Sequence, residues 1–286
     1  MRTVLICPTD RGEVPLISSQ VPLAMAPVLG ETLLEYWLSH FACAKLKQVV
    51  IAAHDRPDLI RNLVGTGSRW GIEVEVTSES QDLTHEQVCQ KYEGHAVIVD
   101  HLPGLPEQQI FAGYDTWYRA LLTWMPRANT PDRVGLRELA DGVWAGLHTR
   151  ISPTARLDAP CWLGNNVYVG DRAIIGPGTI LENGAFIEPE AVISNSVVGP
   201  DTFVGRYMRI ANSIAWGDIL VDWQTGSETI EQNAFLLCSL HPRHIAVKHV
   251  PLMERIAEWL GRWDSDVTLK DDTLLSNEVQ TFKEIS

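Results

Sequence analysis

The first group of residues along the chain that could carry out chemistry is the loop CPTDRGEVPLISSQ, residues 7–20. It directly follows the apolar run VLI. A loop after the first strand of an α/β domain often holds a phosphate through backbone amides and a nearby cation. Its candidate phosphate-binding residues are Thr9, Arg11 and Gly12. The loop has a single glycine and also carries Asp10, so it offers a phosphate little of what such sites use.

A second candidate is HPRHIAVKH, residues 241–249, whose three histidines are spaced three and five residues apart. Because no cysteine or carboxylate lies within it, we interpret it as a solvated basic loop and not as a metal site. The following PLMERIAEWLGRW has the apolar period of a helix, and we expect this helix to cap the open end of the preceding fold. Residues 264–286 are an acidic tail.

Composition excludes several classes of protein. The 286 residues carry a net charge of −13, and an acidic surface repels nucleic acid. No apolar run approaches the roughly 20 residues of a membrane-spanning helix. The five cysteines are scattered without CxxC spacing, which is typical of reduced thiols in the cytoplasm. We therefore expect a cytoplasmic protein with no nucleic-acid or membrane partner.

The first hundred residues alternate apolar runs with helical patterns, and this alternation predicts a parallel, doubly wound, Rossmann-like sheet. Strands are expected at residues 3–7, 48–53, 72–76 and 95–99. Helices are expected at 57–64, at 84–92 and within 30–46, where one apolar face is formed by Leu33, Leu34, Trp37, Leu38 and Phe41. A further helix is expected at 114–125.

The second half of the chain repeats with a period of six. The aliphatic members are Ile151, Leu157, Leu163, Val169, Ile175, Leu181, Ile187 and Ile193. Four residues after each stands a small or β-branched residue: Ala155, Cys161, Val167, Ala173, Thr179, Ala185, Ala191 or Val197. The step then shortens to five, and Val198, Val204 and Ile210 continue the series. Units this short must stack to bury an apolar face.

Six residues suit one flat side of a triangular coil, with the aliphatic residue inside and a small residue beneath it. The pattern resembles the hexapeptide-repeat family, whose fold is a left-handed parallel β-helix, over residues 151–215, with another unit at 230–235. Acyltransferases of that family use a histidine near a coil edge as general base, and carbonic-anhydrase-like members bind a metal with histidines. No histidine lies between Arg150 and Leu240, so the candidates for acyl transfer are His148 and His241.

The two halves together resemble the sugar-nucleotide pyrophosphorylases, which make NDP-sugars from an NTP and a sugar 1-phosphate. The resemblance rests on MAPVLGETLLEYWLSHFACAKLKQVVIAA, similar to the family's Pro-Val-x-Gly-x-Pro-Leu-Leu segment, and on the repeated Asn-Ser-hydrophobic units at 195–197 and 212–214. The family's phosphate loop is Gly-Gly-x-Gly-Thr-Arg. Its glycines fall here on Cys7, Pro8 and Asp10, and its arginine falls on Gly12.

Two further family residues complete that chemistry. The family has a lysine that holds the phosphates, and the position of that lysine is occupied by Leu23 in this sequence. An aspartate that ends the fourth strand and holds Mg²⁺ falls on Asp100, so Mg²⁺ is implied only if nucleotidyltransferase activity is retained. The catalytic half of the family is also about twice as long as this one. The resemblance therefore implies a short, degenerate nucleotidyltransferase-type domain.

We expect an α/β plus β protein in four parts: an α/β domain at 1–101, a partly helical connector at 102–142, a left-handed β-helix at 143–240, and a C-terminal helix with the tail at 241–286. The expected function is a nucleotidyltransferase-like protein of sugar-nucleotide or polysaccharide metabolism. Its pyrophosphorylase activity is weak or absent, and its role is binding, regulation or homo-oligomerisation through the β-helix. The alternatives are an active sugar-1-phosphate nucleotidyltransferase and a hexapeptide-repeat acyltransferase. NTP, NDP-sugar and sugar phosphate are the expected ligands.

Overall fold

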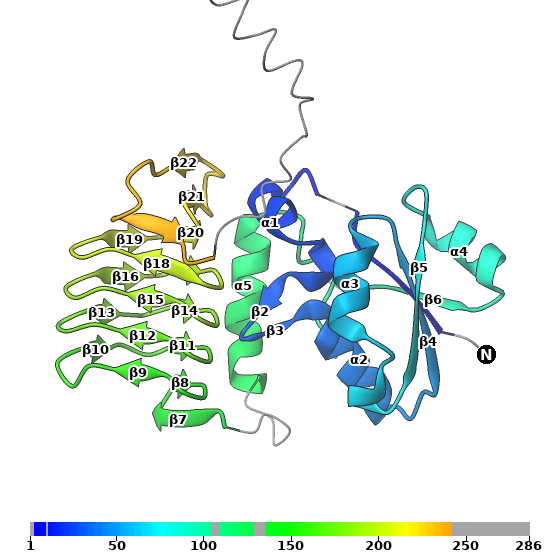
Figure 1. Cartoon of the computed structure of the whole chain (residues 1–286), viewed down its shortest axis with the longest axis horizontal. Helices are drawn as coiled ribbons and strands as arrows, with labels where there is room; N and C mark the ends of the chain where they lie inside the picture. Colours follow the sequence, from blue (N-terminus) through cyan, green and yellow to red (C-terminus); the bar gives the residue numbers. More distant parts are fainter. Residues whose placement is uncertain (1–2, 10, 104–108, 129–134, 242–286) are drawn as a thin grey trace, which may run out of the picture. The chain divides into compact units, whose positions relative to one another are not determined.

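The computed structural model describes residues 3–9, 11–103, 109–128 and 135–241 (Figure 1). Residues 1–241 belong to one compact unit. The expected C-terminal helix, the acidic tail, Asp10, and the two later histidines of the 241–249 loop lie outside the described residues.

The N-terminal part is built on a parallel sheet in the order β5-β4-β1-β6. Its strands are β1 (Thr3–Ile6), β4 (Gln48–Ala53), β5 (Glu73–Ser78) and β6 (His95–Ile98), within about two residues of the strands that the sequence predicts. In register, Val4 lies beside Val50 and Ala96. β6 lies at one edge of this sheet among the described residues.

Helices cover both faces of this sheet, and they bury both sides of its two central strands, β1 and β4. α2 (Leu33–Cys43) and α3 (Pro57–Val64) share a core with Leu5 and Ile51, whereas α4 (His85–Tyr92) packs near Val4 and Val50. The apolar face expected on α2 is buried. A capping box between Thr32 and Glu35 fixes the first turn of α2.

Short elements connect β1 to α2: α1 (Pro15–Gln20), the 3₁₀ turn η1 (Leu23–Met25), and a hairpin of β2 (Pro27–Val28) with β3 (Glu31–Thr32). The hairpin tip is Leu29 and Gly30, both with positive φ. The 3₁₀ turn η2 (Ser68–Trp70) follows α3, and α5 (Tyr114–Trp124) with η3 (Met125–Arg127) precedes the second half. α5 is the helix expected at 114–125.

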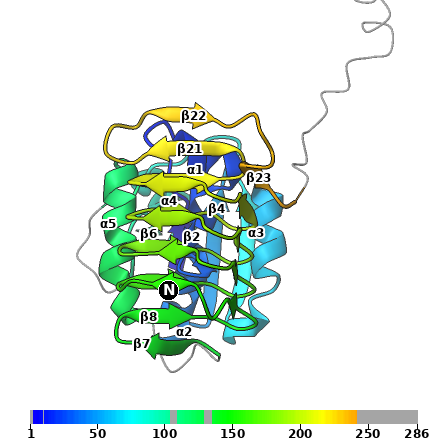
Figure 2. The ribbon, with the colours of Figure 1, turned by 90° about the vertical axis from the view of Figure 1, so that its left-hand side faces the viewer.

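The second half is a parallel β-helix of stacked triangular coils, and its sheets are consistent with the expected left-handed form. The first face contains β8 (Val143–Ala145), β11 (Cys161–Leu163), β14 (Thr179–Leu181), β17 (Val197–Val198) and β20 (Ser213–Trp216). The second contains β9 (Arg150–Ile151), β12 (Tyr168–Val169), β15 (Phe186–Ile187) and β18 (Thr202–Val204). The third contains β10 (Arg156–Leu157), β13 (Ile174–Ile175), β16 (Val192–Ser194) and β19 (Arg209–Ala211). Figure 2 shows the strands of one coil above those of the next.

The hexad residues fill the interior as predicted. From Leu163 to Ile210, every aliphatic member of the series is at most 1% exposed. The coil offset is 18 residues where Leu163 lies beside Leu181, and 17 where Leu181 lies beside Val198, which matches the predicted shortening. One assignment is wrong: Val197 pairs with the outward Ile180, because the missing residue precedes Ser196 in the turn.

Antiparallel strands close both ends of the coil stack. β7 (Arg137–Ala140) pairs with β8, and β21 (Ile219–Asp222) with β22 (Glu228–Ile230) extends the first face beyond β20. β23 (Leu237–Ser239) pairs with β18. The unit expected at 230–235 is therefore not a coil: Ile230 and Phe235 are 60% and 84% exposed, since an antiparallel hairpin does not enclose its apolar side chains.

The first face of the β-helix is apolar on its outside as well as its inside. Its outward residues share a core with α5 and the hairpin: Trp144, Trp162, Ile180, Val197 and Ile214. Tyr118 of α5 donates to the Gly178 carbonyl at 2.7 Å and stacks on Trp223. Burial raises the pKa of Tyr118 to about 12, so its hydroxyl remains a donor.

A buried carboxylate fastens the hairpin tip to a corner of the β-helix. Glu182, 1% exposed, accepts the Leu29 amide at 2.8 Å and the Gly30 amide at 2.7 Å, one on each oxygen. Asn183 donates to the Gly30 carbonyl at 2.8 Å. Burying a charge is costly unless hydrogen bonds compensate it, so this carboxylate requires the docked hairpin.

We expect Glu182→Ala to lower the free energy of unfolding by about 2–4 kcal/mol, because two buried amides lose a charged acceptor. Glu182→Gln should cost about half as much, since its amide oxygen can accept only one of the two bonds. Chemical denaturation measures both. The control Glu190→Ala removes an exposed pair with Arg172 and should cost less than about 1 kcal/mol. Equal effects of Glu182→Ala and Glu190→Ala would contradict the anchoring role.

Candidate functional site

The loop after β1 uses its arginine internally. Arg11 makes two hydrogen bonds to the Asp82 carboxylate, both at 2.8 Å, and lies 3.6 Å from Asp55. Asp55 in turn pairs with Arg56 at 2.9 Å. The guanidinium predicted to bind phosphate is therefore neutralised by carboxylates of the same edge of the sheet.

The space beside this loop is nearly filled. The cavity at the carboxyl ends of β1 and β4 holds about 10 Å³, and Cys7, Glu79 and Asp82 are among its lining residues. Burial raises the pKa of the Cys7 thiol to about 12, so it carries no charge at neutral pH. Thr9 and Gly12 are exposed. Ligands of open α/β sheets bind at such an edge; the space beside this loop holds only about 10 Å³, whereas a cavity of about 600 Å³ lies along β6 and is lined by Asp100 and His101.

The residues predicted for the other phosphate and metal roles lie elsewhere. Leu23 is 2% exposed in the core and offers no charge. Asp100, just after β6, pairs with His101 Nδ1 at 2.7 Å. Within the described part of the chain, no group of three histidine, cysteine or acidic side chains is placed to hold a metal. Asp100 also lines a cavity of about 600 Å³ along β6, together with His85, His95 and His101.

The two histidines predicted for acyl transfer lie at different places. His148 occupies an exposed corner with φ of 58°, in the column of turns that continues through Asn166 and Asp201. His241 lines a cavity of about 400 Å³ between the hairpin and the β-helix, together with Glu182, Asp201 and Trp216. The structure thus brings His241, but not His148, into a cavity.

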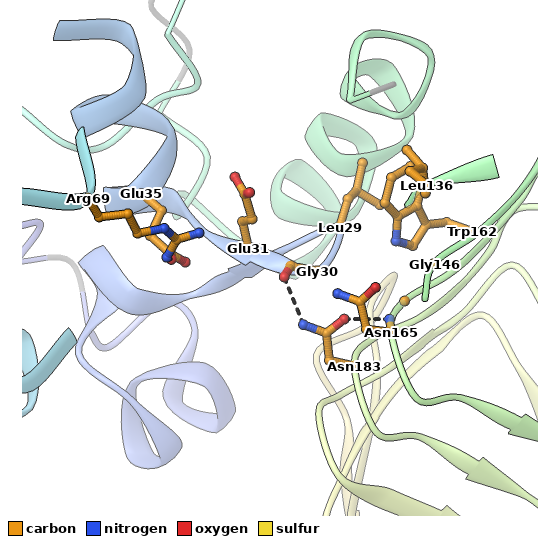
Figure 3. A pocket seen from close by; sticks show the side chains of 11 residues that line it. Leu29, Gly30, Glu31, Glu35, Arg69, Leu136, Gly146, Trp162, Asn165 and Asn183 are labelled. Carbon is orange, nitrogen blue, oxygen red and sulfur yellow. Dashed lines mark hydrogen bonds and ion pairs between the residues drawn. The ribbon is translucent and has the colours of Figure 1, made fainter. Parts of the chain in front are cut away.

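A second cavity, of about 270 Å³, lies on the other side of the hairpin tip (Figure 3). Its polar wall is formed by Glu31, Glu35, Arg69, Asn165 and Asn183. Leu29, Leu136 and Trp162 form an apolar wall. The two cavities share Gly30, Glu31, Glu35 and Asn183, so they flank a single contact between the hairpin and the β-helix corner.

Sequence reasoning missed this junction, although the repeat contains a signal for it. The corner position of successive coils is Gly146, Gly164 and Glu182, each 18 residues after the last. A Cβ on Gly164 would approach Asn183 Oδ1 to 2.6 Å, so the corner needs glycine wherever the next coil packs closely. Glu182 replaces the glycine that the preceding coils have at this corner position, and this replacement marks the coil to which the hairpin binds.

Comparison with protein-family models and with curated protein sequences gives no match. Among solved structures, two mutants of GDP-perosamine N-acetyltransferase from Caulobacter crescentus, each in complex with CoA and GDP-perosamine, align with 81% of this chain and 97% of theirs. Their identities to this chain are 13% and 15%, and both TM-scores are 0.18. A superposition at this level supports no inference about activity.

None of the helices formed by the described residues is both long and apolar enough to cross a bilayer.

The pairing of Arg11 with Asp82 predicts a pH dependence of stability. The hydrogen bond from Arg11 lowers the pKa of Asp82 below its ordinary 3.8. A depressed pKa in the folded state stabilises the protein above pH 3.8, and the contribution is lost as the pH falls through the folded-state value. Because both side chains are about one-third exposed, the contribution is at most about 1 kcal/mol.

Asp82→Asn should therefore unfold at a lower temperature than the wild type near neutral pH, and the two unfolding temperatures should converge as the pH falls below about 3.8. Thermal scans at several pH values measure this difference. Asp58→Asn, which removes an 85% exposed carboxylate, is the control and should lie closer to the wild type. A gap for Asp82→Asn that widens toward low pH would contradict the assignment.

Proposed function

We propose that this chain is a nucleotidyltransferase-like protein of sugar-nucleotide or polysaccharide metabolism that lacks pyrophosphorylase activity and serves as a binding, regulatory or oligomerising subunit. One observation supports the loss of activity above all: the only arginine of the phosphate loop is held by Asp82 and Asp55 beside a cavity of about 10 Å³. The sugar-nucleotide setting rests on the sequence resemblance.

The charges beside the loop oppose phosphate binding. Phosphoryl transfer depends on cations and amides positioned around the phosphates. Here a triphosphate would have to displace two carboxylates from Arg11 and would then face both of them. The family lysine position is the buried Leu23, which cannot compensate. Repulsion and lost ion pairing both oppose binding at this edge of the sheet.

We expect no pyrophosphate release above background when the full chain is incubated with Mg²⁺, any of the common NTPs and a panel of sugar 1-phosphates. Asp100→Ala should not change that background, because in this proposal the carboxylate of Asp100 serves its pair with His101 and has no catalytic role. A coupled pyrophosphate assay measures both. Turnover by the wild type that disappears in Asp100→Ala would overturn the proposal in favour of an active, remodelled nucleotidyltransferase.

Acyl transfer is the second candidate, and the position of His241 favours it. His241 lies at the edge of the β-helix and lines the 400 Å³ cavity with the Asp201 carboxylate. A histidine there could take the proton of an acceptor amine or hydroxyl as that group attacks a thioester carbonyl, and the CoA thiolate would leave.

This second candidate predicts release of free CoA thiol from acetyl-CoA in the presence of an amino-sugar acceptor, detected with a thiol reagent. His241→Ala should slow that release about 100-fold or more, as expected for loss of a general base. His148→Ala, at an exposed corner outside the cavity, is the matched control and should retain the wild-type rate. Absence of acceptor-dependent thiol release would exclude acyl transfer to these acceptors.

A further inference from the structure

We propose that Asn183 is a site of spontaneous deamidation, that the docked hairpin protects it, and that its conversion to a carboxylate releases the hairpin from the β-helix. The sequence contains one Asn-Gly dipeptide, Asn183-Gly184. It lies at the corner to which the hairpin binds, because Asn183 donates to the carbonyl of Gly30. The modification acts on this junction and is independent of the proposed function.

The chemistry of an Asn-Gly dipeptide makes it prone to this reaction. The backbone nitrogen of Gly184 loses its proton and attacks Cγ of Asn183, which closes a succinimide ring. The bond between Cγ and Nδ2 breaks, and the side-chain nitrogen takes up the proton and leaves as ammonia. Water then opens the ring to give aspartate or isoaspartate. Glycine favours the attack because it has no Cβ to obstruct the approach of its nitrogen.

The fold uses both members of this dipeptide. Gly184 has a φ of 73°, and a Cβ on it would collide with the Asp201 carboxylate, so the turn favours glycine. Asn183 uses both ends of its side-chain amide: Oδ1 accepts the Asn165 amide at 2.7 Å, and Nδ2 donates to the Gly30 carbonyl at 2.8 Å. The labile dipeptide therefore follows from the way in which this corner is built.

The native contacts restrain both reacting groups. The Gly184 amide donates to the Asn165 carbonyl at 2.8 Å, so the attacking nitrogen keeps its proton. The Asn183 carbonyl accepts the Asp201 amide at 2.9 Å, which fixes the backbone between the two groups. Movement of Cγ onto the nitrogen would break the side-chain bonds to Gly30 and Asn165, which Figure 3 shows on either side of Asn183. The folded corner should therefore deamidate slowly.

The hairpin is the part of this protection that can be removed without unstacking the coils. Asn165 and Asp201 belong to the neighbouring coils, which are held by paired strands. Gly30 comes from the hairpin outside the coils, and it lies so close that a Cβ on it would be 3.1 Å from Asn183 Oδ1. When the hairpin undocks, Nδ2 loses its acceptor and the side chain loses its cover, so deamidation becomes faster.

The product opposes the contact that protected it. An aspartate at position 183 presents an oxygen where Nδ2 donated to the Gly30 carbonyl, and two acceptors form no hydrogen bond. It also adds a carboxylate next in sequence to Glu182, whose charge is already balanced by the amides of Leu29 and Gly30, and like charges repel. Deamidation thus makes a reversible undocking of the hairpin permanent.

Peptide mapping by mass spectrometry measures the rate of deamidation in mildly alkaline buffer. The folded wild type should convert Asn183 at least about tenfold more slowly than the same chain unfolded in urea. Gly30→Ala adds a Cβ against Asn183 and strains a φ of 84°, and it should convert Asn183 about fivefold faster than the wild type. The matched control is Gly226→Ala, which strains a φ of 72° but meets nothing within 4 Å among the described residues. It should match the wild type.

Amide hydrogen exchange measures the consequence for the hairpin. Glu182 accepts the amides of Leu29 and Gly30, so both should be protected in the wild type. Asn183→Asp imitates the product and should make both amides exchange about tenfold faster. Asn166→Asp makes the same charge change at an exposed turn of the preceding coil and should leave the exchange of both amides unchanged.

The proposal is overturned if the folded wild type converts Asn183 as fast as the chain in urea. It is equally overturned if Gly30→Ala, folded by thermal unfolding, converts Asn183 at the wild-type rate, or if Asn183→Asp leaves the exchange at Leu29 and Gly30 unchanged. Glu182→Gln weakens the same contact and takes the place of Gly30→Ala if that variant does not fold. The pyrophosphate assay is a separate measurement, and neither of its outcomes bears on the deamidation of Asn183.

Discussion

The architecture of residues 3–241 depends on one buried carboxylate. Glu182 lies where neighbouring coils have glycine, and its charge is balanced by the two amides at the hairpin tip. Neither side is stable alone: an uncompensated buried carboxylate and two unpaired amides are each costly. Gly30 must adopt a φ of 84° to present its amide, a conformation that few other residues tolerate. The hairpin leads directly into the cap of α2, so the contact connects the β-helix to the parallel sheet.

That contact also determines where ligands can enter. At the end of β1, the usual place for a nucleotide, Arg11 is paired with carboxylates beside a space of about 10 Å³. Two cavities, of about 270 and 400 Å³, lie on either side of the docked hairpin, where the corner of the β-helix forms one wall. A cavity of about 600 Å³ lies along β6. The acyl-transfer alternative uses the cavity of about 400 Å³ at that corner. In this chain the Pro-Val-x-Gly segment, residues 27–30, serves as a structural anchor and contributes to a wall of both cavities.

Much of the fold follows from local pattern. The strands at the core of the sheet and the helix faces were predictable because alternation and 3.6-residue periods reflect burial directly. The hexads from Leu163 to Ile210 fixed the coil interior and even the shortened turn, because each coil can bury only side chains of the right size at fixed positions. The errors at Val197 and at 230–235 arose where a turn lost a residue and where antiparallel pairing replaced the coil, and neither event changes local composition.

The sequence by itself therefore determined the parallel sheet strands, the repeat and the poor quality of the phosphate loop. Only the tertiary structure decided that Asp82 neutralises Arg11 across 71 residues, that His241 and not His148 enters a cavity, and that Glu182 meets Leu29 and Gly30. The physical reason is that sequence periodicity reports on neighbours along the chain, whereas these contacts join residues far apart in the sequence. Periodicity records which side chains are buried, but it does not record which distant partner satisfies a buried charge or amide. Those pairings are set by the packing of elements far apart in the chain, and they decide where this protein can bind a ligand.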